Sequence, residues 1–154
     1  MKVRVLSKNL FDSILERMRI DNSNVEEHVD KAFISINSSD TTSYFDKDYS
    51  NVLRVVFDDA TPEENEHRLL NGLEPLDLCT VEIGEKIVDF IEAHKNVETF
   101  YVHCRAGQSR SGAVGTFIND FYGEQTFYEF CNSNPIIKPN YFILALLKRI
   151  NYNR

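Results

Sequence analysis

The sequence predicts a single α/β domain, with a central, mostly parallel sheet of four to five strands flanked by helices. Short segments rich in β-branched and aromatic residues alternate with helical stretches, and the chain becomes wholly helical toward its end. No repeat, linker or low-complexity tract divides the 154 residues, a length typical of one compact domain. We therefore treat residues 1–154 as one unit.

Four strands are expected, each short and largely apolar, as buried parallel strands are. They cover residues 3–6, 32–36, 52–57 and 99–103. Helices are expected where apolar residues recur every three or four positions. They cover residues 10–18, 76–94, 110–121, 124–131 and 140–150, the last opened by Pro139 and the N-cap type residue Asn140. The polar stretches 37–51 and 58–75 predict long loops, which are disproportionately functional.

Composition and charge exclude several classes of function. Hydrophobic residues make up 42% and charged residues 27%, which is ordinary globular composition. The longest strictly apolar run has six residues, far below the number needed to cross a bilayer, so no membrane span is expected. The net charge of −7 argues against a nucleic-acid or anionic-membrane partner. Eleven acidic residues lie between Asp58 and Glu92, and we expect them to form a solvated face.

The cysteines point to a reducing compartment. Cys79, Cys104 and Cys131 are odd in number and far apart, so they predict no disulfide framework. The first residues mix charge and polarity too early for a secretory leader, and a cytoplasmic location is therefore expected. Cys79 lies on the apolar stripe of its helix and Cys131 near a helix end, as packed thiols do.

Residues 101–112, YVHCRAGQSRSG, are the segment that carries chemistry. A strand delivers Cys104 to its end, and Arg110 opens a helix. The loop between them can point successive N–H groups into one concavity, to which the helix dipole adds positive charge. Its residues are Arg105, Ala106, Gly107, Gln108 and Ser109. Gly107 permits the positive φ of a sharp loop. The pattern predicts an anion cradle that lowers the pKa of Cys104, with the planar fork of Arg110 gripping two oxygens.

The segment HCRAGQSRSG resembles the HCxxGxxR(S/T) signature loop of the cysteine-dependent protein tyrosine phosphatases, of the compact dual-specificity type. The resemblance is detailed over residues 52–147. It implies that Cys104 attacks phosphorus to form a phosphocysteine, and that Arg110 and the amides of residues 105–110 bind phosphate or a sulfate-like oxyanion. Ser111 would assist departure of the Cys104 thiolate, and His103 would orient the loop. Without the resemblance, Ser111 could equally be an ordinary residue of the first helical turn. His103 would be a core histidine, and its side chain should face away from that of Cys104 because side chains alternate along a strand.

A phosphatase also needs a proton donor for the leaving oxygen. Asp58 and Asp59 follow the strand at residues 52–57, where this family keeps its acid loop. Asp59 better resembles the family's acid, Asp58 is the alternative, and both could merely begin an exposed loop. Dual-specificity members often carry the acid some thirty residues before the cysteine, whereas Asp59 precedes Cys104 by 45. Asn140 resembles the asparagine that braces the signature loop in the family, and it is also a helix N-cap.

The leading hypothesis is a protein phosphatase without metal or other cofactor, acting on a phosphorylated protein or peptide. Phosphotyrosine alone and dual specificity both remain open. One alternative is a catalytically silent phospho-reader, a protein that binds phosphate groups without hydrolysing them. The chain argues against this because it keeps all the expected catalytic residues, Cys104, Arg110 and Asp58 or Asp59. Another is a rhodanese-like sulfur transferase. Loops of that kind place the arginine one position closer to the cysteine, so the five residues between Cys104 and Arg110 disfavour this alternative. Phosphoinositide or RNA 5′-phosphate substrates would require more basic residues than Arg105 and Lys138 supply.

Overall fold

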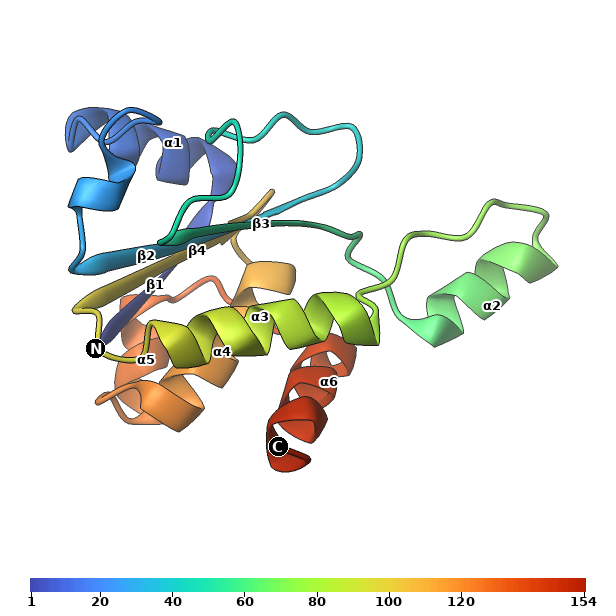
Figure 1. Cartoon of the computed structure of the whole chain (residues 1–154). Coiled ribbons are helices and arrows are strands. Elements are labelled where there is room, and N and C mark those ends of the chain that lie inside the picture. The colour runs from blue at the N-terminus through green and yellow to red at the C-terminus, as the bar shows by residue number, and fades with distance from the viewer.

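The computed structural model describes residues 1–154 and confirms the α/β class, with one four-stranded sheet (Figure 1). The strands run in the spatial order β1-β4-β2-β3, and all three pairings are parallel. They are β1 (Lys2–Ser7), β2 (Lys31–Asn37), β3 (Val52–Val56) and β4 (Thr99–Cys104). Each expected strand is present to within a residue at either end. Because the strands are parallel, the segments that follow β2, β3 and β4 emerge at one edge of the sheet.

Helices cover both faces of the sheet, so the central strands are apolar on both sides (Figure 1). On one face lies α1 (Lys8–Arg17), whose Phe11 and Leu15 belong to the smaller of two hydrophobic cores. The larger core lies on the other face, under α3 (Val81–Ala93), α4 (Arg110–Tyr122), α5 (Phe127–Ser133) and α6 (Tyr141–Tyr152). A short 3₁₀ turn, η1 (Val25–Glu27), precedes β2. None of these helices combines the length and apolar character that crossing a lipid bilayer requires.

Side-chain caps set the helix starts more sharply than the apolar period does. The Thr80 hydroxyl accepts a hydrogen bond from the Ile83 N–H, so α3 begins at Val81 and not at residue 76 as expected. Thr126 forms a capping box with Glu129, and α5 therefore begins at residue 127 and not at 124. Asn140 caps α6 as predicted, accepting from the Ile143 N–H.

The expectation that residues 58–75 form a loop throughout is wrong, because the stretch contains helix α2 (Pro62–Leu70). Thr61 caps this helix and Pro62 takes its first position, where a missing N–H costs nothing. The apolar period could not reveal α2 because none of its residues is buried. The stretch from residue 38 to 51 is irregular, as expected.

Candidate active site

The loop between β4 and α4 curls between a strand end and a helix N-terminus, as the sequence predicted. Gly107 at its centre has φ +72°. A Cβ at this position would lie 2.5 Å from the backbone nitrogen of Ser7, so the loop packs directly on the junction of β1 and α1. Both the backbone angle and this close approach require glycine.

Three backbone hydrogen bonds fix the loop from outside. The Lys8 N–H donates to the Arg105 carbonyl at 3.2 Å, which ties the loop to the start of α1. On the other side, the Lys138 N–H donates to the Gln108 carbonyl at 2.9 Å and the Asn140 N–H to the Ser109 carbonyl at 3.0 Å. Because the carbonyls of these three peptides point to outside donors, the N–H groups of the same peptides, those of Ala106, Ser109 and Arg110, point the opposite way.

The Cys104 side chain is buried at the end of β4, with its Sγ 3.0 Å from the Ser111 Oγ. Burial of the thiol raises its pKa. Hydrogen bonds from the Ser111 hydroxyl and from the N–H groups of Ser111 and Gly107, together with the Arg110 charge, outweigh burial and hold the Cys104 pKa below its ordinary value. The sulfur therefore favours the thiolate, the form that acts as a nucleophile.

Arg110 folds back over the carboxyl edge of the sheet and is buried. Its Nη1 donates to the Ser38 Oγ and to the Phe57 carbonyl oxygen, both at 2.9 Å, just past the ends of β2 and β3. Its Nε and Nη2 donate to no protein group. These two nitrogens form the parallel fork by which arginine holds two oxygens of an oxyanion.

His103 faces the opposite side of β4, where its ring packs 4.3 Å from that of Phe11. Burial lowers the His103 pKa to about 4, so the ring is neutral at pH 7. Its Nδ1 lies 3.1 Å from the Cys104 carbonyl oxygen, which can only accept, so Nδ1 carries the hydrogen. Nε2 then accepts from the Ser35 hydroxyl at 2.6 Å, and Ser35 in turn accepts from the Asn37 amide at 3.1 Å. This chain fixes the peptide that leads out of Cys104.

The two aspartates after β3 have different partners. One carboxylate oxygen of Asp58 accepts the Asp77 N–H at 2.8 Å, and the Asp58 N–H donates to the Asp77 carbonyl at 2.7 Å. Asp58 therefore closes the base of the 58–77 segment. Asp59 is exposed, and its Oδ1 accepts the Ser109 hydroxyl of the signature loop at 2.7 Å. Of the two candidates, Asp59 is the one bonded to the signature loop.

Asn140 joins the two loops. Its amide nitrogen donates to the Asp59 Oδ1 at 2.9 Å and to the Ala60 carbonyl at 3.2 Å, while its backbone N–H holds the Ser109 carbonyl. The same side chain caps α6. The bracing contact and the cap, which sequence reasoning left as compatible alternatives, are present together.

Comparison of the whole chain with solved structures gives nine matching chains, among them the following two. The crystal structure of human DUSP28 matches with a TM-score of 0.54 and 15% identity, covering 99% of this chain and 95% of that chain. The chain has the compact dual-specificity phosphatase fold. The structure of PTPMT1 in complex with PI(5)P matches with a TM-score of 0.49 and 15% identity, covering 99% of this chain and 94% of that chain. No family model and no curated protein matches the sequence.

Within the dual-specificity phosphatase fold, helix α2 accounts for the unusual spacing of Asp59. The helix and the return segment after it, residues 62–77, take up 16 of the 45 positions between Asp59 and Cys104. The remaining 29 agree with the spacing that the resemblance led us to expect. The long gap between Asp59 and Cys104 therefore contains an extra segment that follows Asp59, and Asp59 itself lies just after β3.

Several residues of the site were not expected from the sequence. Ser38 and the Phe57 carbonyl hold Arg110, and Ser35 and Asn37 support His103. The signal for Ser35 was a polar residue inside an apolar strand. The Ser109 hydroxyl also donates to Asp59, a contact that the sequence gave no reason to expect. Cys79 and Cys131 are free and have no bond to Cys104.

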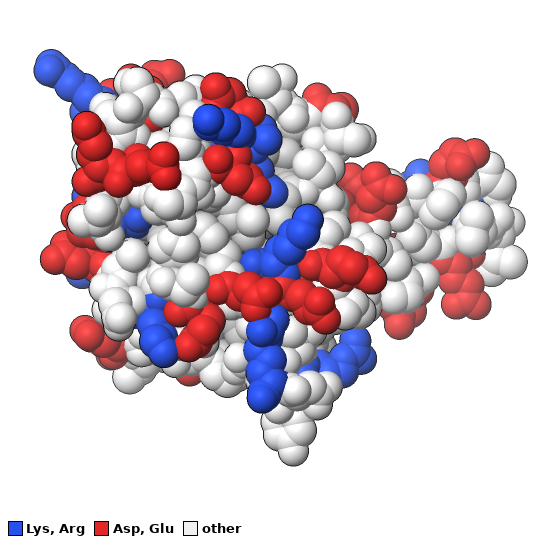
Figure 2. Space-filling model, viewed as in Figure 1, with Lys and Arg blue, Asp and Glu red and all other residues white.

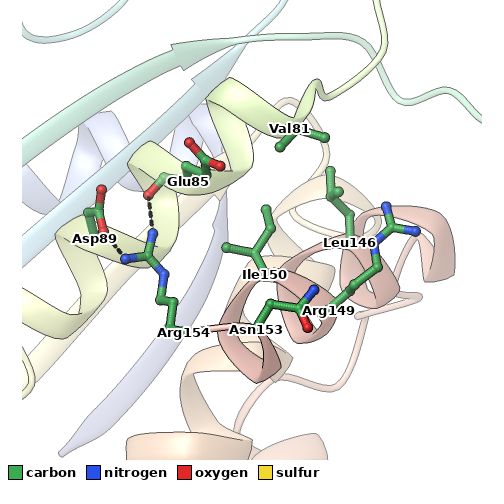
Figure 3. Close-up of a pocket in the computed structure, with 8 residues that line it drawn as sticks. All are labelled: Val81, Glu85, Asp89, Leu146, Arg149, Ile150, Asn153 and Arg154. Atoms are coloured by element: carbon green, nitrogen blue, oxygen red, sulfur yellow. Dashed lines mark hydrogen bonds and ion pairs between the residues drawn. The ribbon is translucent and has the colours of Figure 1, made fainter.

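Two hollows lie at different ends of the molecule. One of about 390 Å³ borders the signature loop and is lined only by polar or charged residues, namely Lys8, Asn9, Asp40, Thr41, Thr42 and Arg105. Another, of about 490 Å³, lies between α3 and α6 near the chain end (Figure 3). There Arg154 pairs with Asp89 at 2.6 Å and donates to the Glu85 carbonyl at 3.5 Å. None of the signature-loop residues lines this second hollow, so it is not part of the site.

Proposed function

We propose that this protein is a phosphatase that hydrolyses phosphate monoesters of proteins or peptides through a phosphocysteine on Cys104. One observation carries the proposal: the Cys104 sulfur, the two free donors of the Arg110 fork and the loop-bound Asp59 converge on one short loop. The lowered Cys104 pKa supplies the nucleophile. Dual-specificity phosphatases combine these same elements, which supports the assignment.

In the first half-reaction the Cys104 thiolate attacks phosphorus, and the bond from phosphorus to the ester oxygen breaks. The leaving oxygen takes a proton from Asp59, because a phenoxide or alkoxide is a poor leaving group. Arg110 and the loop amides stabilise the charge on the remaining phosphoryl oxygens. The product alcohol leaves and the phosphoryl group stays on sulfur.

In the second half-reaction water attacks the phosphocysteine. The Asp59 carboxylate accepts the proton of that water, and the bond from phosphorus to sulfur breaks. The Ser111 hydroxyl, 3.0 Å from the sulfur, donates to the departing thiolate. Inorganic phosphate is released and each group returns to its starting protonation state.

The test is hydrolysis of para-nitrophenyl phosphate with EDTA present, by wild type, Cys104→Ser and Arg110→Lys. Wild type is expected to turn over, Cys104→Ser to bind vanadate without turnover, and Arg110→Lys to be severely impaired because lysine cannot make two-point contact. Turnover by Cys104→Ser would refute the nucleophile. A panel of phosphotyrosine, phosphothreonine and phosphoinositide substrates assigns the class. Wild type active on thiosulfate but inactive on every phosphate ester would favour sulfur transfer.

A further inference from the structure

The segment Pro62–Asp77, which we call the projecting lobe, extends from the body of the molecule (Figure 1). None of its residues is buried. The lobe is nevertheless well organised, because the Asn65 amide donates to the Leu76 carbonyl at 2.9 Å and accepts the Leu76 N–H at 2.8 Å. Its base is closed by the two bonds between Asp58 and Asp77. Polar and backbone groups thus hold the lobe's shape.

The side chains of three leucines at the tip of the projecting lobe have no part in that organisation. Leu69, Leu70 and Leu73 are 61%, 80% and 51% exposed. Helix α2 ends in a Schellman motif around Gly72, in which an apolar residue at the position of Leu73 usually packs on the preceding turn. Here that turn offers His67 and Arg68, so the usual apolar partner is missing. Exposed leucines gathered within five residues are typical of an interaction surface.

The charge around these leucines identifies the chemistry of the partner. The projecting lobe carries five carboxylates against one arginine, whose Nε donates to the Glu74 carbonyl. Its surface is accordingly white and red, with little blue (Figure 2). A hollow of about 420 Å³ on the lobe is lined by Glu63, Glu64, His67, Arg68 and Leu76. Complementarity requires apolar side chains for the leucines and basic side chains for the carboxylates.

We propose that the projecting lobe docks a segment of the substrate protein that bears basic and apolar side chains, away from the phosphorylated residue. A second copy of this chain is disfavoured, because two acidic lobes would repel each other. The lobe begins three residues after Asp59, so a substrate held there is tethered to the molecule that carries the catalytic loop. Docking then raises the effective concentration of the phosphorylated residue at Cys104. The identity of the partner as a substrate rests on the proposed function; binding to the lobe does not.

The first experiment measures binding alone. The probe is a fluorescein-labelled peptide of lysines and leucines without phosphate, titrated with wild type, Leu70→Ser/Leu73→Ser and Glu63→Gln/Glu64→Gln. Leu70→Ser/Leu73→Ser is expected to weaken binding at least about ten-fold, the scale of one leucine side chain removed from water. Glu63→Gln/Glu64→Gln is expected to weaken binding because it removes two charges that complement the lysines of the peptide. The matched control is Val29→Ser/Glu27→Gln, which alters an apolar residue 81% exposed and an exposed acid elsewhere and should bind as wild type does. Equal binding by the lobe and control variants overturns the proposal.

The second experiment separates docking from catalysis. A phosphotyrosine joined to the same peptide by a Gly-Ser linker is compared with the phosphotyrosine peptide alone. We expect the lobe variants to raise KM for the linked substrate about ten-fold, with unchanged kcat and unchanged para-nitrophenyl phosphate turnover. Normal turnover with no change in KM rejects docking and leaves the phosphatase assignment standing. Absent wild-type turnover rejects the phosphatase assignment, while the binding titration still decides docking. Sedimentation equilibrium tests whether a second copy occupies the surface. If the wild type is a dimer and Leu70→Ser is a monomer, the surface binds a second copy and the substrate proposal is overturned.

Discussion

Asn140 is the residue whose two functions can be separated by mutation. Its side-chain oxygen caps α6, and its side-chain nitrogen holds Asp59 and the Ala60 carbonyl. Serine is as good an N-cap as asparagine but cannot reach Asp59, whereas alanine provides neither contact. Asn140→Ser should therefore remove only the contact with the acid loop, and Asn140→Ala should remove the cap as well.

The size of the effect follows from these bonds. A hydrogen bond to a charged group contributes about 1.5–3 kcal/mol, and we take the lower end because Asp59 is exposed and keeps the Ser109 hydroxyl. A loss of about 1.4 kcal/mol in the transition state slows the reaction about ten-fold. Loss of the cap costs about a further 1 kcal/mol of stability, a lowering of Tm by about 2–4 °C in a domain of this size.

The assay compares kcat for phenyl phosphate, whose leaving group needs a proton, with kcat for para-nitrophenyl phosphate, whose leaving group hardly does. Both variants are expected to slow phenyl phosphate hydrolysis about ten-fold and to change the second substrate little. Asn140→Ala should also melt below Asn140→Ser. The reasoning is refuted if Asn140→Ser keeps the wild-type ratio of the two rates, or if Asp58→Ala lowers phenyl phosphate hydrolysis more than Asp59→Ala does.

Three further predictions test the loop. Gly107→Ala should lower Tm and abolish activity. Gly72 has the same φ of +72° but open space around its Cβ, so Gly72→Ala should lower the free energy of unfolding by only about 1 kcal/mol. Equal effects of the two substitutions would show that close packing on Ser7 is unimportant. Burial lowers the His103 pKa from 6.5 to about 4, so between these pH values the unfolded chain binds a proton at His103 and the folded chain does not. The free energy of unfolding should therefore fall as the pH is lowered from 6.5 to 4, by up to about 3 kcal/mol. Urea unfolding of His103→Asn should show a flatter dependence over that window, and an unchanged slope would contradict the assignment. Ser111→Ala should raise the Cys104 pKa, measured by the pH dependence of alkylation by iodoacetamide, and an unshifted profile would remove Ser111 from thiolate stabilisation.

Local patterns in the chain determined most of the fold. The four strands, the helix that starts at Arg110 and the cap at Asn140 are all specified by short-range periodicity and by residue type, and the structure has each of them. The signature loop was recognisable for the same reason, since Cys104 and Arg110 are close in sequence and a strand, a loop and a helix enforce their geometry.

What the sequence could not decide depends on contacts between distant segments. Asp58 and Asp59 are neighbours with the same chemistry, and only the packing of the loop after β3 places Asp77 against the first and Ser109 and Asn140 against the second. Ser38 and Phe57 hold Arg110 because parallel pairing brings the ends of β2 and β3 beside the start of α4. Helix α2 escaped detection because periodicity reports burial, and this helix buries no side chain of its own.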